Sequence, residues 1–86
     1  MKKITSLEDL KKEAIYSEKE IAEFFILLNG GLRSSKRIVY FPDTDTFDVL
    51  NEIDDSFQED LSVEQLENET HITLAINNGA LFKYDN

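Results

Sequence analysis

Apolar residues recur at helical spacing in the first part of the chain. Three of them fall on one helix face at i, i+3 and i+7: Leu7, Leu10 and Ala14. Two polar pairs match the capping-box spacing at its start: Thr5 with Glu8, and Ser6 with Asp9. Acids come early in this segment and lysines follow, which suits the helix dipole. The pattern therefore predicts a helix within 5–16, starting in one of two registers.

The next apolar stretch, IAEFFILL, is compatible with two structures. Ser17 and Glu20 repeat the capping-box spacing ahead of it. A helix stripe would consist of Ile21, Phe24, Phe25 and Leu28, ended by Asn29-Gly30. Alternatively, a short helical turn leads into a buried strand over 24–28, and Asn29-Gly30 forms a hairpin turn. Short apolar runs do not separate these structures, and we prefer the strand.

β-branched and aromatic residues from Lys36 to Phe41 give the clearest strand pattern in the chain. Pro42 ends this strand, and 43–46 is typical of a turn. A second strand that begins near Phe47 then completes an antiparallel hairpin over 36–52. In one register Ile38 and Tyr40 share a face, and Phe47 and Val49 could face the same core.

The C-terminal third predicts two further elements. Ser62 with Gln65 matches a capping box and indicates a short helix over 62–68. Over 70–78, Thr70 could cap a second helix that Gly79 would end. The same segment could instead form a strand that Asn78-Gly79 turns back through 81–82 as a hairpin. We prefer the helix.

Length and composition limit the class of protein. Eighty-six residues make one domain, 1–86, with no internal repeat or linker. We predict an α+β fold, in which a two- to four-stranded antiparallel meander packs with two to four short helices. The chain has no Cys, which excludes disulfides and Cys-ligated metals. The lysines near its start precede no signal-like apolar run, and the longest such run, 24–28, is far shorter than the ~20 residues that span a bilayer. We expect a soluble, cytoplasmic protein.

Charge is distributed very unevenly. The formal net charge is −9, with nine basic and eighteen acidic residues, which argues against direct binding to nucleic acid or an anionic membrane. Eleven of the acids lie in 43–69, a segment with no Lys or Arg: Asp43, Asp45, Asp48, Glu52, Asp54, Asp55, Glu59, Asp60, Glu64, Glu67 and Glu69. Such a segment is either a solvated surface or a surface that presents carboxylates to a basic protein.

Specific metal binding by this acidic segment fails a positional test. In an EF-hand loop that began at Asp43, the fifth, sixth and twelfth positions need an oxygen ligand, Gly and Glu. They are occupied by Phe47, Asp48 and Asp54. We therefore expect no EF-hand, no resident metal and no cofactor.

The basic cluster Arg33, Lys36 and Arg37 follows two glycines and surrounds two serines. It lacks the spacing of a phosphate-binding loop, and a strand follows it rather than a helix. We interpret the stretch mainly as a turn whose basic residues pair with acids such as Glu52, Asp54 or Asp55, with a small-anion or partner-contact site as the alternative. His71 is the only histidine. With one His and no Cys, no triad or zinc site can be assembled from familiar parts, and we predict no catalytic residue and no enzyme.

Residues 23–82 resemble a group of short, acidic, uncharacterised proteins of bacteria, phages and mobile elements. The similar stretches are LNGGLRSSK, NEIDDSFQ and THITLAINNGAL. The resemblance implies a phage or mobile-element setting and favours the helix at 70–78. It implies no catalytic residue.

These observations predict a non-catalytic interaction or inhibitor protein that binds a basic protein partner through its acidic 43–69 face. That partner could be a protein that handles nucleic acid. The candidate partner-binding residues are Asp43, Asp45, Asp48, Glu52, Asp54, Asp55, Glu59, Asp60, Arg33, Lys36 and Arg37. The alternative is a structural or regulatory subunit that acts by homo-oligomerisation through an apolar sheet face. Either a monomer or a homodimer is compatible with the sequence.

Overall fold

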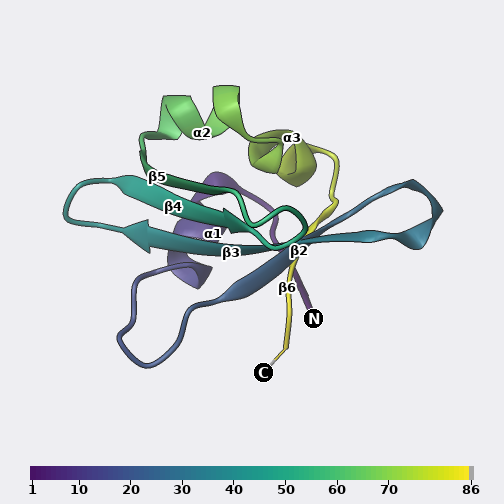
Figure 1. Ribbon diagram of the computed structural model, residues 1–86, viewed down its shortest axis with the longest axis horizontal. Helices are drawn as coiled ribbons and strands as arrows, with labels where there is room; N and C mark the ends of the chain where they lie inside the picture. Colours follow the sequence, from purple (N-terminus) through teal and green to yellow (C-terminus); the bar gives the residue numbers. More distant parts are fainter. Residues whose placement is uncertain (86) are drawn as a thin grey trace.

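The computed structural model describes residues 1–85, which form one six-stranded antiparallel sheet and three α-helices (Figure 1). The strand order across the sheet is β1-β6-β2-β3-β4-β5. The elements along the chain are β1 (Lys2–Lys3), α1 (Leu7–Glu13), β2 (Glu23–Leu27), the 3₁₀ turn η1 (Asn29–Gly31), β3 (Arg33–Phe41), β4 (Thr46–Asn51), β5 (Phe57–Leu61), α2 (Val63–Glu69), α3 (Ile72–Asn77) and β6 (Leu81–Lys83). The α+β class is confirmed, but the predicted two to four strands are too few.

The central hairpin is confirmed in its register. β3 pairs with β4 so that Ile38 lies opposite Val49 and Tyr40 opposite Phe47. Because opposite residues share a face, all four side chains point to the same side of the sheet, as the alternation predicted. β3 begins earlier than predicted, at Arg33, because its first residues pair with β2.

The helix N-termini follow the polar signals in the sequence. Ser6 is the N-cap of α1 and accepts a hydrogen bond from the Asp9 N–H at 3.0 Å, so the second of the two registers is used. Ser62 and Gln65 form both bonds of the capping box at α2. The preferred helix at 70–78 is confirmed as α3, but its N-cap is His71 and not Thr70, whose hydroxyl accepts from the Ile72 N–H.

The two ambiguous apolar stretches are resolved differently. The strand over 24–28 is confirmed as β2, and the helix stripe does not form. The helical turn expected from Ser17 and Glu20 is also wrong, since 17–22 has no helix and the Lys19 N–H bonds to the Ser17 hydroxyl instead. Gly30 and Gly31 take φ of +81° and +83°, a conformation that glycine adopts without strain.

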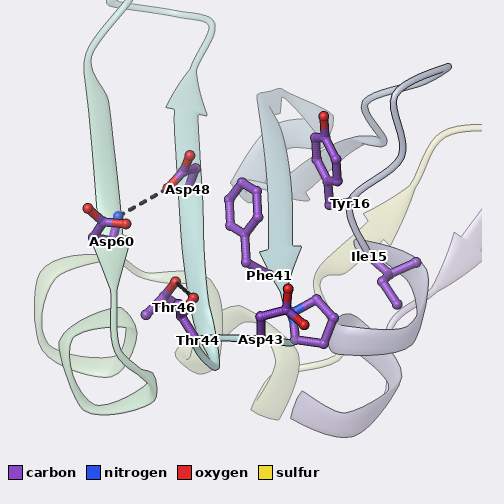
Figure 2. Close-up of a pocket in the computed structure, with 9 residues that line it drawn as sticks. Ile15, Tyr16, Phe41, Asp43, Thr44, Thr46, Asp48 and Asp60 are labelled. Atoms are coloured by element: carbon purple, nitrogen blue, oxygen red, sulfur yellow. Dashed lines mark hydrogen bonds between the residues drawn. The ribbon is translucent and has the colours of Figure 1, made fainter.

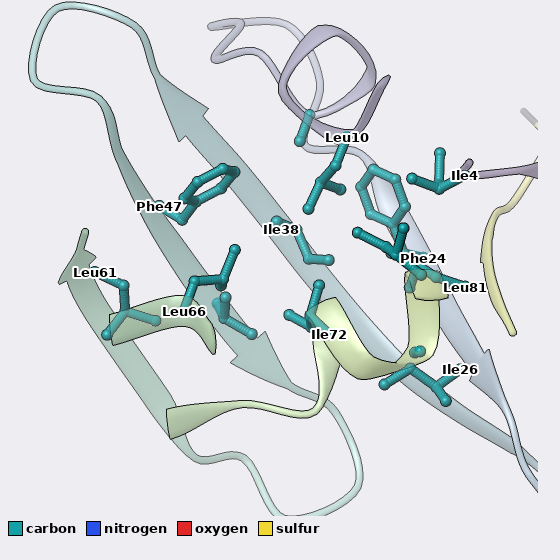
Figure 3. Close-up of a cluster of buried hydrophobic side chains, with 14 residues drawn as sticks. Ile4, Leu10, Phe24, Ile26, Ile38, Phe47, Leu61, Leu66, Ile72 and Leu81 are labelled. Atoms are coloured by element: carbon teal, nitrogen blue, oxygen red, sulfur yellow. The ribbon is translucent and has the colours of Figure 1, made fainter. Parts of the chain in front are cut away.

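All three helices pack on one face of the sheet (Figure 3). Leu10 from α1, Leu66 from α2 and Ile72 from α3 are fully buried against strand residues such as Ile38 and Phe47. Because antiparallel strands alternate their side chains, this one-sided core leaves the opposite face of the sheet without a helix among residues 1–85.

Candidate functional site

The face of the sheet opposite the helices is apolar over much of its area. Antiparallel sheets that expose one face to water usually carry polar residues there. Here β3 contributes Val39 and Phe41 to that face, and β4 contributes Leu50 opposite Arg37. The run from Ile38 to Phe41 is thus apolar on both sides of the sheet.

One half of this face is sealed by its own side chains. Phe25 on β2 is only 1% exposed although no helix covers it. Phe82 stacks on its ring with centroids 5.3 Å apart, and the Tyr84 ring lies at 4.7 Å. The Arg33 guanidinium carbon lies 4.4 Å from the Phe25 centroid and completes the cover. This half therefore presents no free apolar surface.

The other half is open. Tyr16 stacks on Phe41 with centroids 5.4 Å apart. Three apolar side chains at its border are more than half exposed: Tyr16 at 51%, Ile21 at 51% and Phe57 at 56%. Together with strand residues they line a pocket of about 310 Å³. We call this the open groove and define it by Tyr16, Ile21, Val39, Phe41, Leu50 and Phe57.

Three carboxylates line a second pocket beside the open groove (Figure 2). These are Asp43, Asp48 and Asp60, and the pocket, of about 450 Å³, shares Tyr16, Phe41 and Asp48 with the pocket of the open groove. Asp48 lies opposite Val39, halfway along the open groove. The Asp60 N–H donates to Asp48 Oδ1 at 3.0 Å, which fixes β5 beside β4 at this point. Within residues 1–85, none of the three carboxylates has a Lys or Arg within ion-pair distance. We call Asp43, Asp48 and Asp60 the acidic end.

The eleven acids of 43–69 surround one edge of the sheet. They lie on the β3–β4 turn, on β4 and the loop after it, on β5 and on α2. Only two of them form ion pairs in the described part of the chain: Asp45 with Lys11 at 3.1 Å, and Glu52 with Arg37 at 2.9 Å. The Tyr40 hydroxyl also donates to Asp45, and this bond, followed by Lys11, lowers the pKa of Asp45. Among residues 1–85 the other nine carboxylates form no ion pair, although Asp54 lies near Lys36.

The three predicted basic contact residues are engaged within the protein. Arg33 covers Phe25. Arg37 pairs with Glu52, as predicted for a turn whose basic residues pair with nearby acids. The Lys36 ammonium donates to Asn51 Oδ1. Burial lowers the pKa of Lys36, and the nearby Asp54 opposes that effect. Their first role is therefore to stabilise β3 against its neighbours.

No other chemistry converges on this surface. Among residues 1–85, no three His, Asp or Glu side chains come together to hold a metal ion. Phe47, which occupies the ligand position in the EF-hand test, is fully buried in the core. His71 is exposed just before α3, on an element that packs against the opposite face. None of the helices described could cross a bilayer, since all are too short and too polar.

The sequence reasoning missed the open groove. Its border residues Tyr16, Ile21 and Phe57 come from segments that are far apart in the chain. No sequence pattern predicted that these segments would meet at one pocket. One local signal was present: an uninterrupted apolar run such as Ile38–Phe41 is typical of a strand covered on both faces. Residues 1–85 provide no second layer of helices to cover this face.

Comparison with known proteins adds no relative. No family model matches the chain, and no curated protein or solved structure matches it. The fold is that of a small α+β protein whose sheet carries no helix on one face among residues 1–85.

Proposed function

We propose that this is a non-catalytic interaction protein that binds a basic protein partner through the acidic side of its sheet. The observation that carries the proposal is the set of nine carboxylates in 43–69 that form no ion pair among residues 1–85. The rest of the chain holds all nine Lys and Arg residues but only seven acids. Within residues 1–85, Lys11 and Arg37 each pair with one acid of this segment, which leaves most of its carboxylates available to a cationic partner.

Electrostatics of this kind accelerates encounter and selects for partners of opposite charge. The same surface would repel phosphate groups, so the partner is a protein and not a nucleic acid. A protein with a basic surface that itself handles nucleic acid fits this requirement. The resemblance to short acidic phage and mobile-element proteins supports such a setting for the proposal.

The test is a pull-down from a lysate of the native host with the tagged protein as bait. We expect a basic partner to be retained at about 0.1 M salt and lost by about 0.5 M, because the screening length falls from about 10 Å to a few Å. An Asp54→Asn, Asp55→Asn variant should retain less partner. A Glu8→Gln, Glu18→Gln variant has the same net charge as the Asp54→Asn, Asp55→Asn variant, but its substitutions lie outside 43–69. It should retain as much partner as the wild type. Equal retention by both variants, or retention that persists at high salt, would refute the proposal.

The uncovered sheet face favours a second candidate function. A homo-oligomer formed through the apolar face would bury Tyr16, Ile21 and Phe57, which the described chain leaves more than half exposed. Light scattering would then give a mass above 9.9 kDa. A monomer at high concentration would eliminate this candidate.

A further inference from the structure

The open groove has the dimensions of a binding site for a short helix. Its axis runs along β3 from Arg37 to Phe41, which spans about 13 Å at the usual strand rise. Two turns of an α-helix rise about 11 Å. Helices are also the usual cover of a sheet face, as the opposite side of this sheet shows. Two helical turns with apolar residues at i, i+3, i+4 and i+7 would fill the groove.

Charge defines the orientation of the occupant. At one end of the groove Arg37 is already neutralised by Glu52. From the middle of the groove, where Asp48 lies opposite Val39, towards its other end, Asp43, Asp48 and Asp60 form no ion pair in residues 1–85. The occupant should therefore carry Lys or Arg where its apolar stripe reaches the acidic end. A basic last turn is also favourable for the helix itself, because it offsets the negative end of the helix dipole.

Charge also selects among alternative occupants. A nucleic-acid strand could stack on Tyr16 and Phe57, but its phosphates would meet the acidic end. A second copy would bring a chain of net charge −9 against another of the same charge. An amphipathic helix with a basic end avoids both conflicts.

We propose that the open groove binds an amphipathic helix of the partner, with two apolar turns over Val39, Phe41, Leu50 and Phe57 and a Lys or Arg at the acidic end. This inference rests on the proposed function, since it assigns the chemistry of the basic partner. It adds that affinity comes from apolar burial in the groove, while the carboxylates set orientation and the rate of encounter.

The direct test uses two synthetic amphipathic helices of about 18 residues, a length that supports helicity in water. Both carry the same Leu stripe; one has Lys and Arg in its last turns and the other has Glu there. Each is titrated into ¹⁵N-labelled protein and followed by NMR. We expect the basic helix to shift the amide resonances of Val39, Leu50 and Phe57, and the acidic helix to bind at least about tenfold more weakly. No binding by the basic helix, or shifts confined to other surfaces, would overturn the proposal.

Matched variants separate the apolar groove from general stickiness. Phe57 and Leu74 are both 56% exposed, but Leu74 lies on α3, away from the groove. Because both side chains are largely exposed, serine in their place should leave the fold intact. Phe57→Ser should weaken binding of the basic helix by about tenfold, as expected for loss of an aromatic anchor. Leu74→Ser should leave binding unchanged, and an equal effect of the two changes would refute a groove-specific contact.

A second pair of variants separates the acidic end from net charge. Asp43→Asn with Asp60→Asn removes two charges beside the groove, and Asn tolerates the positive φ of Asp60. Glu64→Gln with Glu67→Gln removes two exposed charges on α2. Only the first pair should weaken the basic helix and reduce its preference over the acidic one. Equal effects would show that net charge alone attracts the peptide.

Two outcomes distinguish this inference from the proposed function. A host partner that is lost on Asp54→Asn, Asp55→Asn substitution but retained by Phe57→Ser would support acidic binding and refute the groove. A monodisperse dimer that Phe57→Ser converts to a monomer would assign the groove to a second copy and overturn the helix proposal. Sedimentation velocity with the full chain shows whether this dimer forms before any peptide is added.

Discussion

Replacement of Arg33 by alanine tests whether side chains alone cover the half of the helix-free sheet face that surrounds Phe25. Arg33 covers the ring of Phe25, which is 1% exposed, at a distance of 4.4 Å from its guanidinium carbon to the ring centroid. A cation–π contact contributes about 0.5–1 kcal/mol at exposed positions and about 2 kcal/mol when desolvated. The aliphatic stem of Arg33 adds apolar cover to that contact. We therefore expect Arg33→Ala to lower the free energy of unfolding by about 1–2 kcal/mol.

For a domain of this size, each 1 kcal/mol corresponds to a fall of about 4–8 °C in Tm. Urea denaturation followed by circular dichroism, with a thermal scan, measures both quantities. Arg33→Met keeps part of the stem without the charge and should recover part of the loss. Arg37→Ala is the matched control on the same strand and face, since its exposed ion pair with Glu52 should contribute little. If Arg33→Ala and Arg37→Ala destabilise the protein equally, the sealing role of Arg33 is wrong.

Three further predictions concern caps, charge and backbone. Ser62→Ala removes the acceptor for the Gln65 N–H at the start of α2 and should cost about 1 kcal/mol in urea denaturation, while Ser62→Thr should cost less. The folded-state pKa of Asp45 lies below its ordinary value, chiefly because Tyr40 donates to it, so its stabilisation is present above about pH 4 and lost as pH falls through the folded pKa. The stability difference between the wild type and Asp45→Asn should therefore shrink in acid, and a difference independent of pH would contradict this assignment. Gly30→Ala should cost about 1 kcal/mol through its φ of +81° alone, because nothing lies within 4 Å of an added Cβ, and Gly30→Asn should cost less.

The parts of the fold that were predicted correctly depend on interactions between near neighbours in sequence. The cap of α2 needs only Ser62 and Gln65, and the β3–β4 hairpin is closed by a short turn after Pro42. Such signals act over a few residues, so one chain is enough to read them. The Ser17 pattern shows the limit of this reasoning, because a capping box alone does not stabilise a helical turn that the tertiary structure leaves exposed.

The missed strands depend on pairing across the chain. β6 has three residues and joins the sheet by pairing with β2, more than fifty positions earlier, while β1 has only two residues. β5 reads FQEDL, and the register shift between Phe47 and Val49 interrupts its pairing with β4. Adjacent acids and a bulge remove the alternation by which strands are recognised. The same nonlocal pairing creates the open groove, so the groove could not be located from the sequence.

The acidic segment was found by counting residues, but its meaning depends on where the fold places them. β5 is an edge strand, and charged side chains on an edge oppose the addition of a further strand. This explains Glu59 and Asp60, the two acids of the segment that lie on β5. It does not explain the nine others, and the opposite edge strand, β1, carries lysines instead of acids. Asp43 and Asp48 in particular lie on the β3–β4 turn and on β4, beside an apolar groove, and form no ion pair among residues 1–85. Protection of an edge therefore accounts for a minority of the carboxylates, and the cationic partner that we propose would account for the positions of those beside the groove.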